Sequence, residues 1–466
     1  MGKGRSVLRR TALASALLAL VTAPLVAVTG AAQAEEDTYY PAKGDPNVDV
    51  GRYNLDLDWD PDARLLTGTA DVRLSVFAAA PAVKLDLHKR MEVSSVAVNG
   101  VPAPFTHDGK DLTVTTAVAP GATYLVTVKY AGKPRTVKAP TSRGDDDGLG
   151  WHTNTKGQVW TMQKPFGAYT WFPVNDHLSD KAFFDVRLTV PEKWTGVSTG
   201  RLVDKTTSGK RTRTHFTNAS PMPPHLLTVA IGPYKKYTQA GPHDLPLTYW
   251  LPKNRADLLK PLEKTPETIS FLESRLGTYP FDSAGVVVTP GLGSVETQTL
   301  MTLSADNYKQ GGEDVRQQVA HNLAHAWYGA SVTPNDWRDN WMNESVATFL
   351  EAKFSTAHHW RTWKYWKREF ARNDDYYREI YGPPGAYLPK QFGQRNVTYG
   401  GALLMEKLRA KVGTDLFYAA LAEWPAQNAG RNRGRQTYVD WLSQRTGQDL
   451  RAWFTAWLDS PTTPAS

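Results

Sequence analysis

The hydrophobic period of the chain changes near residue 246, and this change constrains the fold more than any other feature. Segments such as 53–59 and 70–76 alternate apolar and polar residues, which is typical of strands with one buried face. Turn signals at Asn99-Gly100 and Asp108-Gly109 separate such runs. Beyond residue 246, apolar residues recur at helical spacings. The sequence therefore predicts a two-domain α+β protein, in which an antiparallel β-domain precedes a mainly α-helical domain.

The helical part contains several amphipathic segments. Helices are predicted over residues 256–276, 313–327, 344–358 and 360–370. In the second of these, Val315, Val319 and Leu323 lie four residues apart, so they form a stripe that faces the core. Asn343 precedes the third segment and is a suitable N-cap, because its side chain accepts hydrogen bonds from free main-chain N–H groups.

The N-terminus has the three parts of a secretory signal peptide. Four basic side chains are followed by an apolar stretch, and the stretch ends in the small-x-small sequence Ala32-Gln33-Ala34. Pro24 and this ending disfavour a membrane anchor. We expect cleavage after Ala34 and secretion of the remainder, through the general secretory route or the twin-arginine route suggested by Arg9-Arg10.

The predicted organisation therefore has four parts. Residues 1–34 form the signal peptide, residues 35–245 the β-domain, residues 246–460 the helical domain and residues 461–466 a loose tail. No other stretch of the sequence is long and apolar enough to span a bilayer, so we expect no membrane association of the mature protein.

Charge and cysteine content exclude several classes of function. The formal charge is +8, and residues 1–34 carry four basic and no acidic side chains, which leaves +4 for the remainder. This charge is too small to predict nucleic-acid binding. The chain has no cysteine, so disulfides and thiolate metal sites are excluded. Any transition-metal site must be built from histidines and carboxylates.

His321 and His325 are the strongest candidates for such a site. They lie four residues apart in a predicted helix, which places both imidazoles on one face and one turn apart. A zinc site needs a third protein ligand, and Glu344 follows His325 by nineteen positions, at the start of the next predicted helix. The pair alone is also compatible with two ordinary histidines, so the surrounding sequence decides the interpretation.

That surrounding sequence resembles the aminopeptidase N family of gluzincin zinc peptidases. His321-Asn-Leu-Ala-His325-Ala-Trp-Tyr-Gly329 followed by Trp341-Met-Asn-Glu344 is similar to the family signature H-E-L-A-H-x-W-F/Y-G and W-L-N-E. The resemblance covers about residues 45–460 and is to short, secreted bacterial-type members. It implies a thermolysin-like helical domain, one Zn²⁺ per chain held by His321, His325 and Glu344, and hydrolysis of peptides with a free N-terminus.

The resemblance assigns roles to three further residues. Gly293-Ser-Val-Glu296-Thr is similar to the family's G-A-M-E-N, which makes Glu296 the anchor of the substrate's α-amino group. Thr-Tyr399-Gly-Gly-Ala is similar to S-Y-x-K-G-A, which makes Tyr399 the hydrogen-bond donor to the oxyanion. The segment around Gln163 is similar to a part of the β-domain that lines the substrate cleft, so we expect Gln163 to assist Glu296. Thr297 and Gly400 depart from the two motifs.

The departure with the largest chemical consequence is Asn322. The family has a glutamate at this position, which accepts a proton from the attacking water and passes it to the leaving amine. An amide cannot accept that proton near neutral pH. The sequence therefore predicts a zinc- and peptide-binding homologue with impaired hydrolysis. Two alternatives remain, namely an active peptidase that uses another base and a non-catalytic binding module with a vestigial site.

Overall fold

The structure, a computed structural model, describes residues 1–2, 36–144, 147–309 and 311–465. All but the first two residues of the predicted signal peptide lie outside the described residues. In the described residues no helix has the length and apolar character needed to cross a membrane. Thr463, in the segment expected to be loose, donates hydrogen bonds to Asp374 and Asp375.

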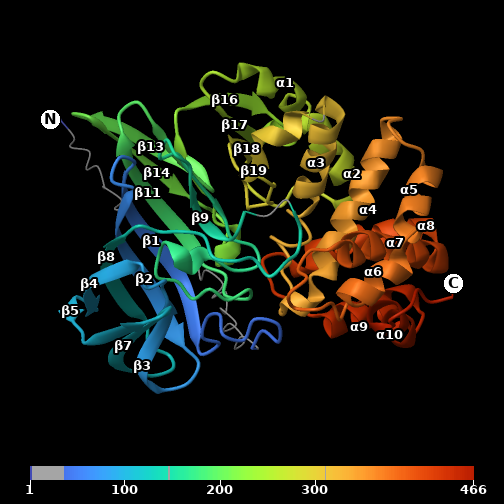
Figure 1. Ribbon diagram of the computed structural model, residues 1–466, viewed down its shortest axis with the longest axis horizontal. Coiled ribbons are helices and arrows are strands. Elements are labelled where there is room, and N and C mark those ends of the chain that lie inside the picture. Colours follow the sequence, from blue (N-terminus) through green and yellow to red (C-terminus); the bar gives the residue numbers. More distant parts are fainter. Residues whose placement is uncertain (3–35, 145–146, 310, 466) are drawn as a thin grey trace. The chain divides into compact units, whose positions relative to one another are not determined.

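The N-terminal part is built from strands, as the alternating pattern predicts (Figure 1). Its largest sheet has the order β13 (Arg201–Ser208), β14 (Arg211–Thr217), β11 (Phe183–Pro191), β1 (Val48–Asp60), β2 (Leu65–Val76), β8 (Tyr124–Gly132), β4 (Met91–Val98), β5 (Val101–Pro102). Tyr53, Leu55 and Leu57 on β1 are buried, and the residues between them are not, because successive side chains point to opposite faces.

Most strand pairs of this sheet are antiparallel, as expected, but one is parallel. In the antiparallel ladder between β1 and β2, Leu55 lies opposite Ala70. On its other side, β1 runs parallel to β11, with Leu55 opposite Val186. The two parallel strands are far apart in sequence, so the long connection that a parallel pair requires is available. Local alternation predicts a strand but contains no information about the direction of its partner.

Three smaller sheets complete the strand-rich part. The first contains β3 (Ala80–Asp86), β7 (Asp111–Val118) and β6 (Phe105–Asp108). The second contains β12 (Thr195–Ser198), β15 (Val229–Gly232), β10 (Val159–Met162) and β9 (Gly150–Thr153). The third contains β16 (Tyr234–Ala240), β17 (Pro246–Pro252), β18 (Ala284–Thr289) and β19 (Met301–Ser304). The third sheet extends into the helical part, where its strands share a core with the helices.

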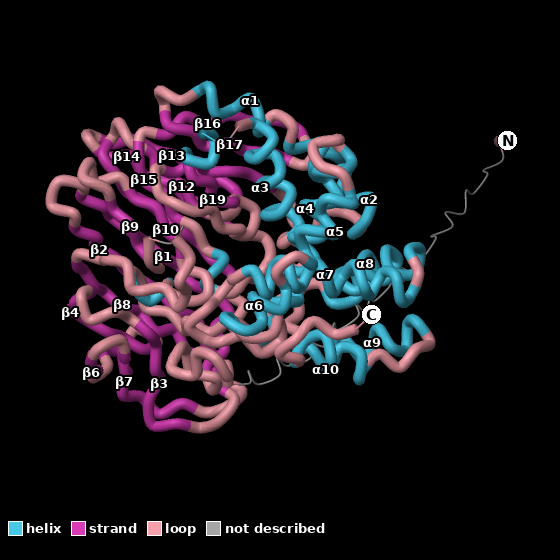
Figure 2. The backbone as a smooth tube through the Cα atoms, turned by 45° about the vertical axis from the view of Figure 1, so that its right-hand side comes forward, coloured by secondary structure: helices cyan, strands magenta, loops and turns pink. Residues whose placement is uncertain are grey.

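The C-terminal part is mainly helical, which confirms the predicted α+β organisation (Figure 2). Its α-helices are α1 (Leu259–Leu262), α2 (Thr265–Leu276), α3 (Gly312–Ala324), α4 (Trp341–Ala357), α5 (Trp363–Ala371), α6 (Asp374–Tyr381), α7 (Arg395–Val412), α8 (Thr414–Asn428), α9 (Arg435–Thr446) and α10 (Arg451–Asp459). Val315, Val319 and Leu323 are buried on α3, as their spacing predicts.

Several helix boundaries differ from the sequence-based expectation, because α3 ends at Ala324, α5 begins at Trp363, and two further differences change an interpretation. The predicted helix over 256–276 is divided into a 3-10 turn and the helices α1 and α2. Asn343 is not an N-cap, because α4 begins at Trp341 and Asn340 precedes it. Asn340 already has helical backbone angles and directly follows the 3-10 turn Trp337–Asp339, so the chain is helical before the predicted start.

Helices α4 and α7 lie side by side (Figures 1 and 2). Their close approach depends on Gly401, because a Cβ atom there would lie 2.1 Å from the Ser345 hydroxyl oxygen. Glycine lets two helix backbones come together where any larger side chain would hold them apart. Glu344 directly precedes Ser345 on α4, and Tyr399 precedes Gly401 by two residues on α7.

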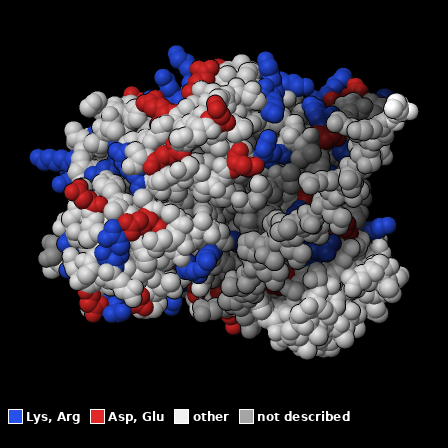
Figure 3. Space-filling model, turned by 180° about the vertical axis from the view of Figure 1, so that it is seen from behind, with Lys and Arg blue, Asp and Glu red and all other residues white. Residues whose placement is uncertain are grey.

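Acidic and basic side chains are mixed on the surface. On the face drawn in Figure 3, Lys and Arg residues are interspersed with Asp and Glu residues. Such a distribution agrees with the small net charge of the sequence after residue 34.

Candidate metal centre

The two histidines predicted to bind zinc meet at the C-terminal end of α3. His321 lies in its last turn and His325 follows directly as the C-cap residue. Their Nε2 atoms are 3.2 Å apart, and the His325 side chain is 2% exposed. The helical spacing therefore places both ring nitrogens at one point, as the sequence predicts.

Glu344 is the third residue that lies beside the two Nε2 atoms. It lies in the first turn of α4, and its Oε2 atom is 3.5 Å from His321 Nε2 and 3.8 Å from His325 Nε2. Zinc binds such ligands at about 2.0–2.1 Å in tetrahedral geometry, which corresponds to ligand–ligand distances of roughly 3.3 Å. The three observed distances lie close to this value, so the cluster of His321, His325 and Glu344 fits a single zinc ion.

The outer nitrogens of both rings have acceptors that fix the ring orientation. His325 Nδ1 donates to the Tyr328 carbonyl at 3.1 Å, and His321 Nδ1 lies 3.0 Å from Glu351 Oε2. These bonds place a proton on each Nδ1 and leave the Nε2 lone pairs directed at the common point, which is the arrangement that metal-binding histidines require.

Glu351 was not among the residues predicted from the sequence. A signal was present, because Glu351 follows Glu344 by seven residues, which is two helical turns and therefore the same face of α4. Its second oxygen, Oε1, accepts a hydrogen bond from Gln317 at 2.8 Å. One oxygen of Glu351 thus bonds to Gln317 of α3, and the other orients the ring of His321.

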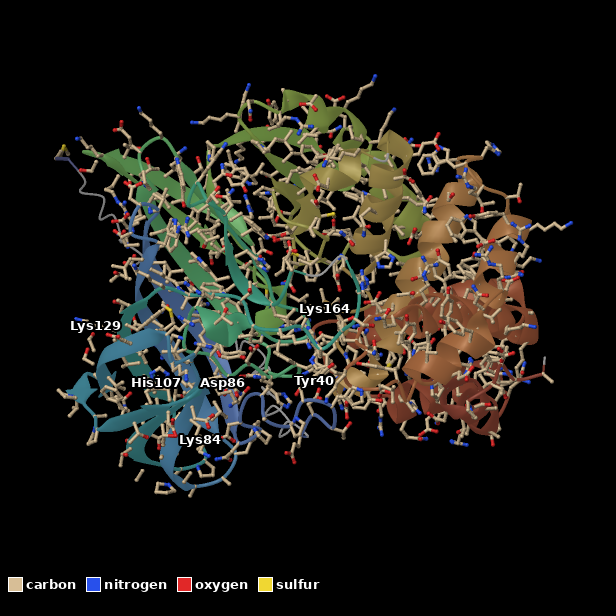
Figure 4. The ribbon with its side chains drawn as sticks, in the orientation of Figure 1. Tyr40, Lys84, Asp86, His107, Lys129 and Lys164 are labelled. Carbon is tan, nitrogen blue, oxygen red and sulfur yellow. The ribbon has the colours of Figure 1, made fainter. Side chains whose placement is uncertain are left out.

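Lys164 is the second functional candidate that the sequence did not reveal. It follows β10 in the strand-rich part, and its ammonium donates to Glu344 Oε1 at 2.7 Å and to Glu296 Oε1. Its side chain is 8% exposed. Figure 4 shows Lys164 between the strands of the N-terminal part and the helices of the C-terminal part. No local pattern predicts this contact, because the two carboxylates are 132 and 180 residues away in sequence.

These contacts keep the acidic groups of the site ionised. Burial by itself raises the pKa of Glu344, but the Lys164 ammonium and the contacts with the two histidines lower it well below its ordinary value. Burial likewise raises the pKa of Glu296, and His325 and Lys164 outweigh that effect and lower it. Burial lowers the pKa of Lys164, but its two carboxylate partners raise it above its ordinary value. The three groups therefore carry their charges at neutral pH.

Asn322 lies beside the cluster and has one free donor. Its side chain is buried, and its Oδ1 atom accepts a hydrogen bond from Gln318 Nε2 at 3.0 Å. Its Nδ2 atom has no hydrogen-bond partner among the described residues. The position that the resemblance assigns to a proton acceptor is therefore occupied by a neutral group that presents a hydrogen-bond donor.

Hollows open beside the cluster, and His321 and Glu344 line two of them. The first, of about 770 Å³, also includes Lys164, Glu296 and Asn322 in its lining. The second is about 1350 Å³ and includes Glu351, Arg395 and Tyr399. The structure thus brings Tyr399 and Glu296 into the surroundings of the cluster, on the two hollows that open from it.

Gln163 lines the first hollow, but its side-chain amide forms hydrogen bonds with other residues of the strand-rich part. Its amide nitrogen donates to the Pro224 and Leu227 carbonyls at 2.8 and 2.9 Å. Its oxygen accepts from Trp171 Nε1 at 2.9 Å. These bonds use both amide hydrogens within the strand-rich part, so Gln163 supports the wall of the hollow. Its neighbour in sequence, Lys164, is the residue that contacts Glu296.

Two family models match most of the chain. The model of the peptidase M1 N-terminal domain matches residues 50–226, and that of the peptidase family M1 domain matches residues 261–457. Among individual proteins, aminopeptidase N of Acetobacter pasteurianus is 26% identical over 316 residues, which cover 64% of this chain and 88% of that protein. Aminopeptidase N of Streptomyces lividans is 25% identical over 312 residues, which cover 60% of this chain but only 35% of that protein.

Solved structures show the same architecture. An M1 zinc metallopeptidase from Deinococcus radiodurans is 25% identical and superposes with a TM-score of 0.80, covering 92% of this chain and 97% of that chain. A mutant M1 zinc metallopeptidase from the same organism, bound to a Tyr-Ser-Ala substrate, is 25% identical with a TM-score of 0.82 and covers 92% and 98%.

Proposed function

Because the chain belongs to peptidase family M1, the family of aminopeptidase N, we propose that it binds one zinc ion through His321, His325 and Glu344 and holds peptides at that ion, with hydrolysis impaired. The observation that carries this proposal is the complete three-ligand cluster beside Asn322, which cannot act as a base. The first half of the proposal concerns binding, and the second half concerns turnover.

The residues around the cluster support zinc binding. Zinc in such a site polarises a substrate carbonyl and lowers the pKa of water to about 7. The protein contributes orientation, because Glu351 and the Tyr328 carbonyl fix the two rings and Lys164 holds the outer oxygen of Glu344. Tyr399 lines the larger hollow, where we propose that its hydroxyl donates to the oxygen of the carbonyl under attack.

Impaired hydrolysis follows from the absence of a proton acceptor at position 322. General acid–base assistance contributes about 10²- to 10⁴-fold to the rate of such reactions. Asn322 offers a donor in its place, and its oxygen is already bonded to Gln318. The carboxylates that line the hollows are engaged as well, because Glu296 pairs with Lys164 and Glu351 bonds to His321. These contacts disfavour the alternative in which another carboxylate replaces the missing base.

The sequence also predicts that Glu296 binds a free α-amino group. Glu296 does lie beside the cluster, 3.9 Å from His325 Nε2. However, Lys164 already donates to one oxygen of Glu296, so a substrate ammonium bound there would share that carboxylate with Lys164. We therefore propose peptide binding at the zinc site without assigning the N-terminal group to Glu296.

Three measurements on the mature chain test this function. Elemental analysis should find one zinc per chain. Peptides related to Tyr-Ser-Ala should bind only when zinc is present. The substitution Asn322→Glu should raise the turnover of aminoacyl anilides by about 10²- to 10⁴-fold at unchanged zinc content. Zinc-free protein would support the vestigial binding module instead. Wild-type turnover that the variant does not increase would show that another group already serves as the base.

We also propose that the protein is secreted, on the basis of its N-terminal sequence. Protein recovered from the medium of an expressing bacterial culture should begin at Glu35. Recovery of the uncleaved chain from the cytoplasm alone would refute this proposal.

A further inference from the structure

Arg395 presents a cation without an anionic partner to the larger of the two hollows that His321 and Glu344 line. Its side chain is exposed, and its guanidinium forms no hydrogen bond or ion pair with the described residues. The guanidinium carbon lies 4.8 Å from the centre of the Tyr399 ring, so the cation rests on an aromatic side chain four residues later in α7. Arg395 is also the first residue of α7, where the helix dipole disfavours a positive charge.

The larger hollow is polar throughout its lining. Apart from Gly144 and Gly393, every residue that lines it has a polar or charged side chain. The hollow that contains Glu296 differs, because its lining includes the apolar side chains of Val295 and Phe392. Burial of a polar group is unfavourable unless the group finds hydrogen-bond partners. The larger hollow therefore suits the main chain and the charged groups of a peptide better than an apolar side chain.

The carboxylates of this lining do not compensate Arg395. Glu344 and Glu351 each accept hydrogen bonds from other side chains of the site, and neither forms an ion pair with Arg395. Arg143 lines the same hollow and brings a second guanidinium group. A zinc ion bound beside the hollow would add further positive charge. The electrostatic balance of the larger hollow therefore favours an anionic group from a ligand.

The position of Arg395 relative to Tyr399 indicates where along a peptide this anionic group would lie. The proposed function places the Tyr399 hydroxyl at the carbonyl held at the zinc, and Arg395 lies one turn earlier on the same helix. One helical turn is about 5.4 Å long, and an extended chain advances about 3.3–3.6 Å per residue. Arg395 is therefore placed to reach a group one or two residues beyond that carbonyl.

We propose that Arg395 binds a carboxylate of the peptide in the larger hollow, one or two residues beyond the carbonyl held at the zinc. The C-terminus of a short peptide and an acidic side chain of a longer one share this chemistry. Arginine can bind either carboxylate through two parallel N–H···O bonds, which gives orientation as well as affinity. This inference rests on the proposed binding of peptides at zinc, and it names the substrate class of that same site.

Calorimetric binding of three tripeptides to the zinc-loaded protein tests the inference. Tyr-Ser-Ala has a terminal carboxylate, Tyr-Ser-Ala amide has none, and Tyr-Ser-Asp amide has only a side-chain carboxylate. We expect Tyr-Ser-Ala to bind about three- to fivefold more tightly than its amide at low salt, which is the range for an exposed ion pair. This ratio should fall toward one in about 1 M salt, because salt screens such a pair. Tighter binding of Tyr-Ser-Asp amide than of the neutral amide would identify acidic side chains as a second source.

Variants identify the residue that causes this preference. Arg395→Gln removes the cation, so the affinity ratio of Tyr-Ser-Ala to its amide should fall to about one while binding of the amide changes little. Arg395→Lys keeps the charge without the paired donors and should give an intermediate ratio. Arg361→Gln is the matched control, because Arg361 is also exposed and also lies over the ring of a tyrosine four residues later, at 5.7 Å from Tyr365, but does not line the hollow.

The outcomes separate the inference from the proposed function. Equal binding of Tyr-Ser-Ala and its amide to wild-type protein would overturn the inference and leave zinc-dependent peptide binding intact. A preference for the carboxylate that persists in Arg395→Gln would also overturn it, because the zinc ion or another group would then bind the carboxylate. No binding of any probe to protein that carries one zinc would overturn the proposed function as well. The salt dependence of the wild-type ratio is decisive even if Arg395→Gln does not fold.

Discussion

Replacement of Glu351 by glutamine tests the geometry of the proposed zinc site without altering a metal ligand. Glu351 accepts on both oxygens, from His321 at 3.0 Å and from Gln317 at 2.8 Å. Glutamine has almost the same shape but only one acceptor oxygen. If that oxygen faces His321, the new amide group meets the amide donor of Gln317. If it faces Gln317, the amide group meets the Nδ1 proton of His321. Either orientation breaks one of the two bonds.

The expected effect is a weaker zinc site with an unchanged fold. Loss of a group that orients a metal-binding histidine typically reduces metal affinity about 10- to 100-fold, which corresponds to roughly 1.4–2.7 kcal/mol. The Glu351 side chain is 22% exposed, so solvent weakens this contact only partly. The dissociation constant for zinc, measured by competition with a chromophoric chelator at fixed pH, is the direct readout.

Glu267 offers a matched control. Its Oε1 atom lies 2.6 Å from His358 Nε2, so it also pairs with a histidine, but neither residue belongs to the cluster. We expect Glu267→Gln to leave zinc affinity unchanged. A zinc affinity of Glu351→Gln within about twofold of wild type would refute the proposal that His321 binds zinc through Nε2 in the orientation that Glu351 sets.

Three further predictions concern the stability of the fold. Free zinc at 100 times its dissociation constant should raise the free energy of unfolding by about 2.7 kcal/mol, as measured by denaturant titration with and without a chelator. Lys181→Met removes hydrogen bonds from the ammonium to carbonyl groups that include those of Ala330 and Ser331, and it should lower the free energy of unfolding by about 2 kcal/mol at unchanged zinc stoichiometry. Gly401→Ala would place a methyl carbon 2.1 Å from the Ser345 hydroxyl oxygen, and we expect it to cost about 1–3 kcal/mol in the same titration and to weaken zinc binding by displacing α4. Equal unfolding midpoints of wild type and either variant would contradict the corresponding contact.

The parts of the site that could be predicted from the sequence are those with a local periodic signal. The four-residue spacing of His321 and His325 determines their positions on one helix face, and the structure brings their Nε2 atoms within 3.2 Å. The buried stripe of α3 follows from the same period. Glu344 required the resemblance to a known family, because spacing alone does not specify how the chain returns from α3 to α4.

The contacts that could not be predicted join segments that lie far apart in the sequence and have no common pattern of apolar residues. Lys164 follows a short strand and reaches carboxylates in two distant segments, so only the assembled fold shows its role. The parallel pairing of β1 with β11 has the same origin, since alternation specifies a strand and leaves its partner undetermined. Glu351 is an intermediate case. Its seven-residue spacing from Glu344 indicated the same helix face, but Glu351 belongs to no motif that would have indicated its role.

The division of Glu344 between two partners has a consequence for thermodynamic linkage. One of its oxygens faces the two histidines, and the other accepts a hydrogen bond from Lys164, which belongs to the strand-rich part of the chain. Thermodynamic linkage is reciprocal. If a bound ion strengthens the Lys164 contact by a certain factor, the Lys164 contact strengthens binding of the ion by the same factor. Metal affinity and the contact of Lys164 with the helical part are therefore coupled through a single carboxylate, and a mutation of Glu344 or Lys164 that alters one is expected to alter the other.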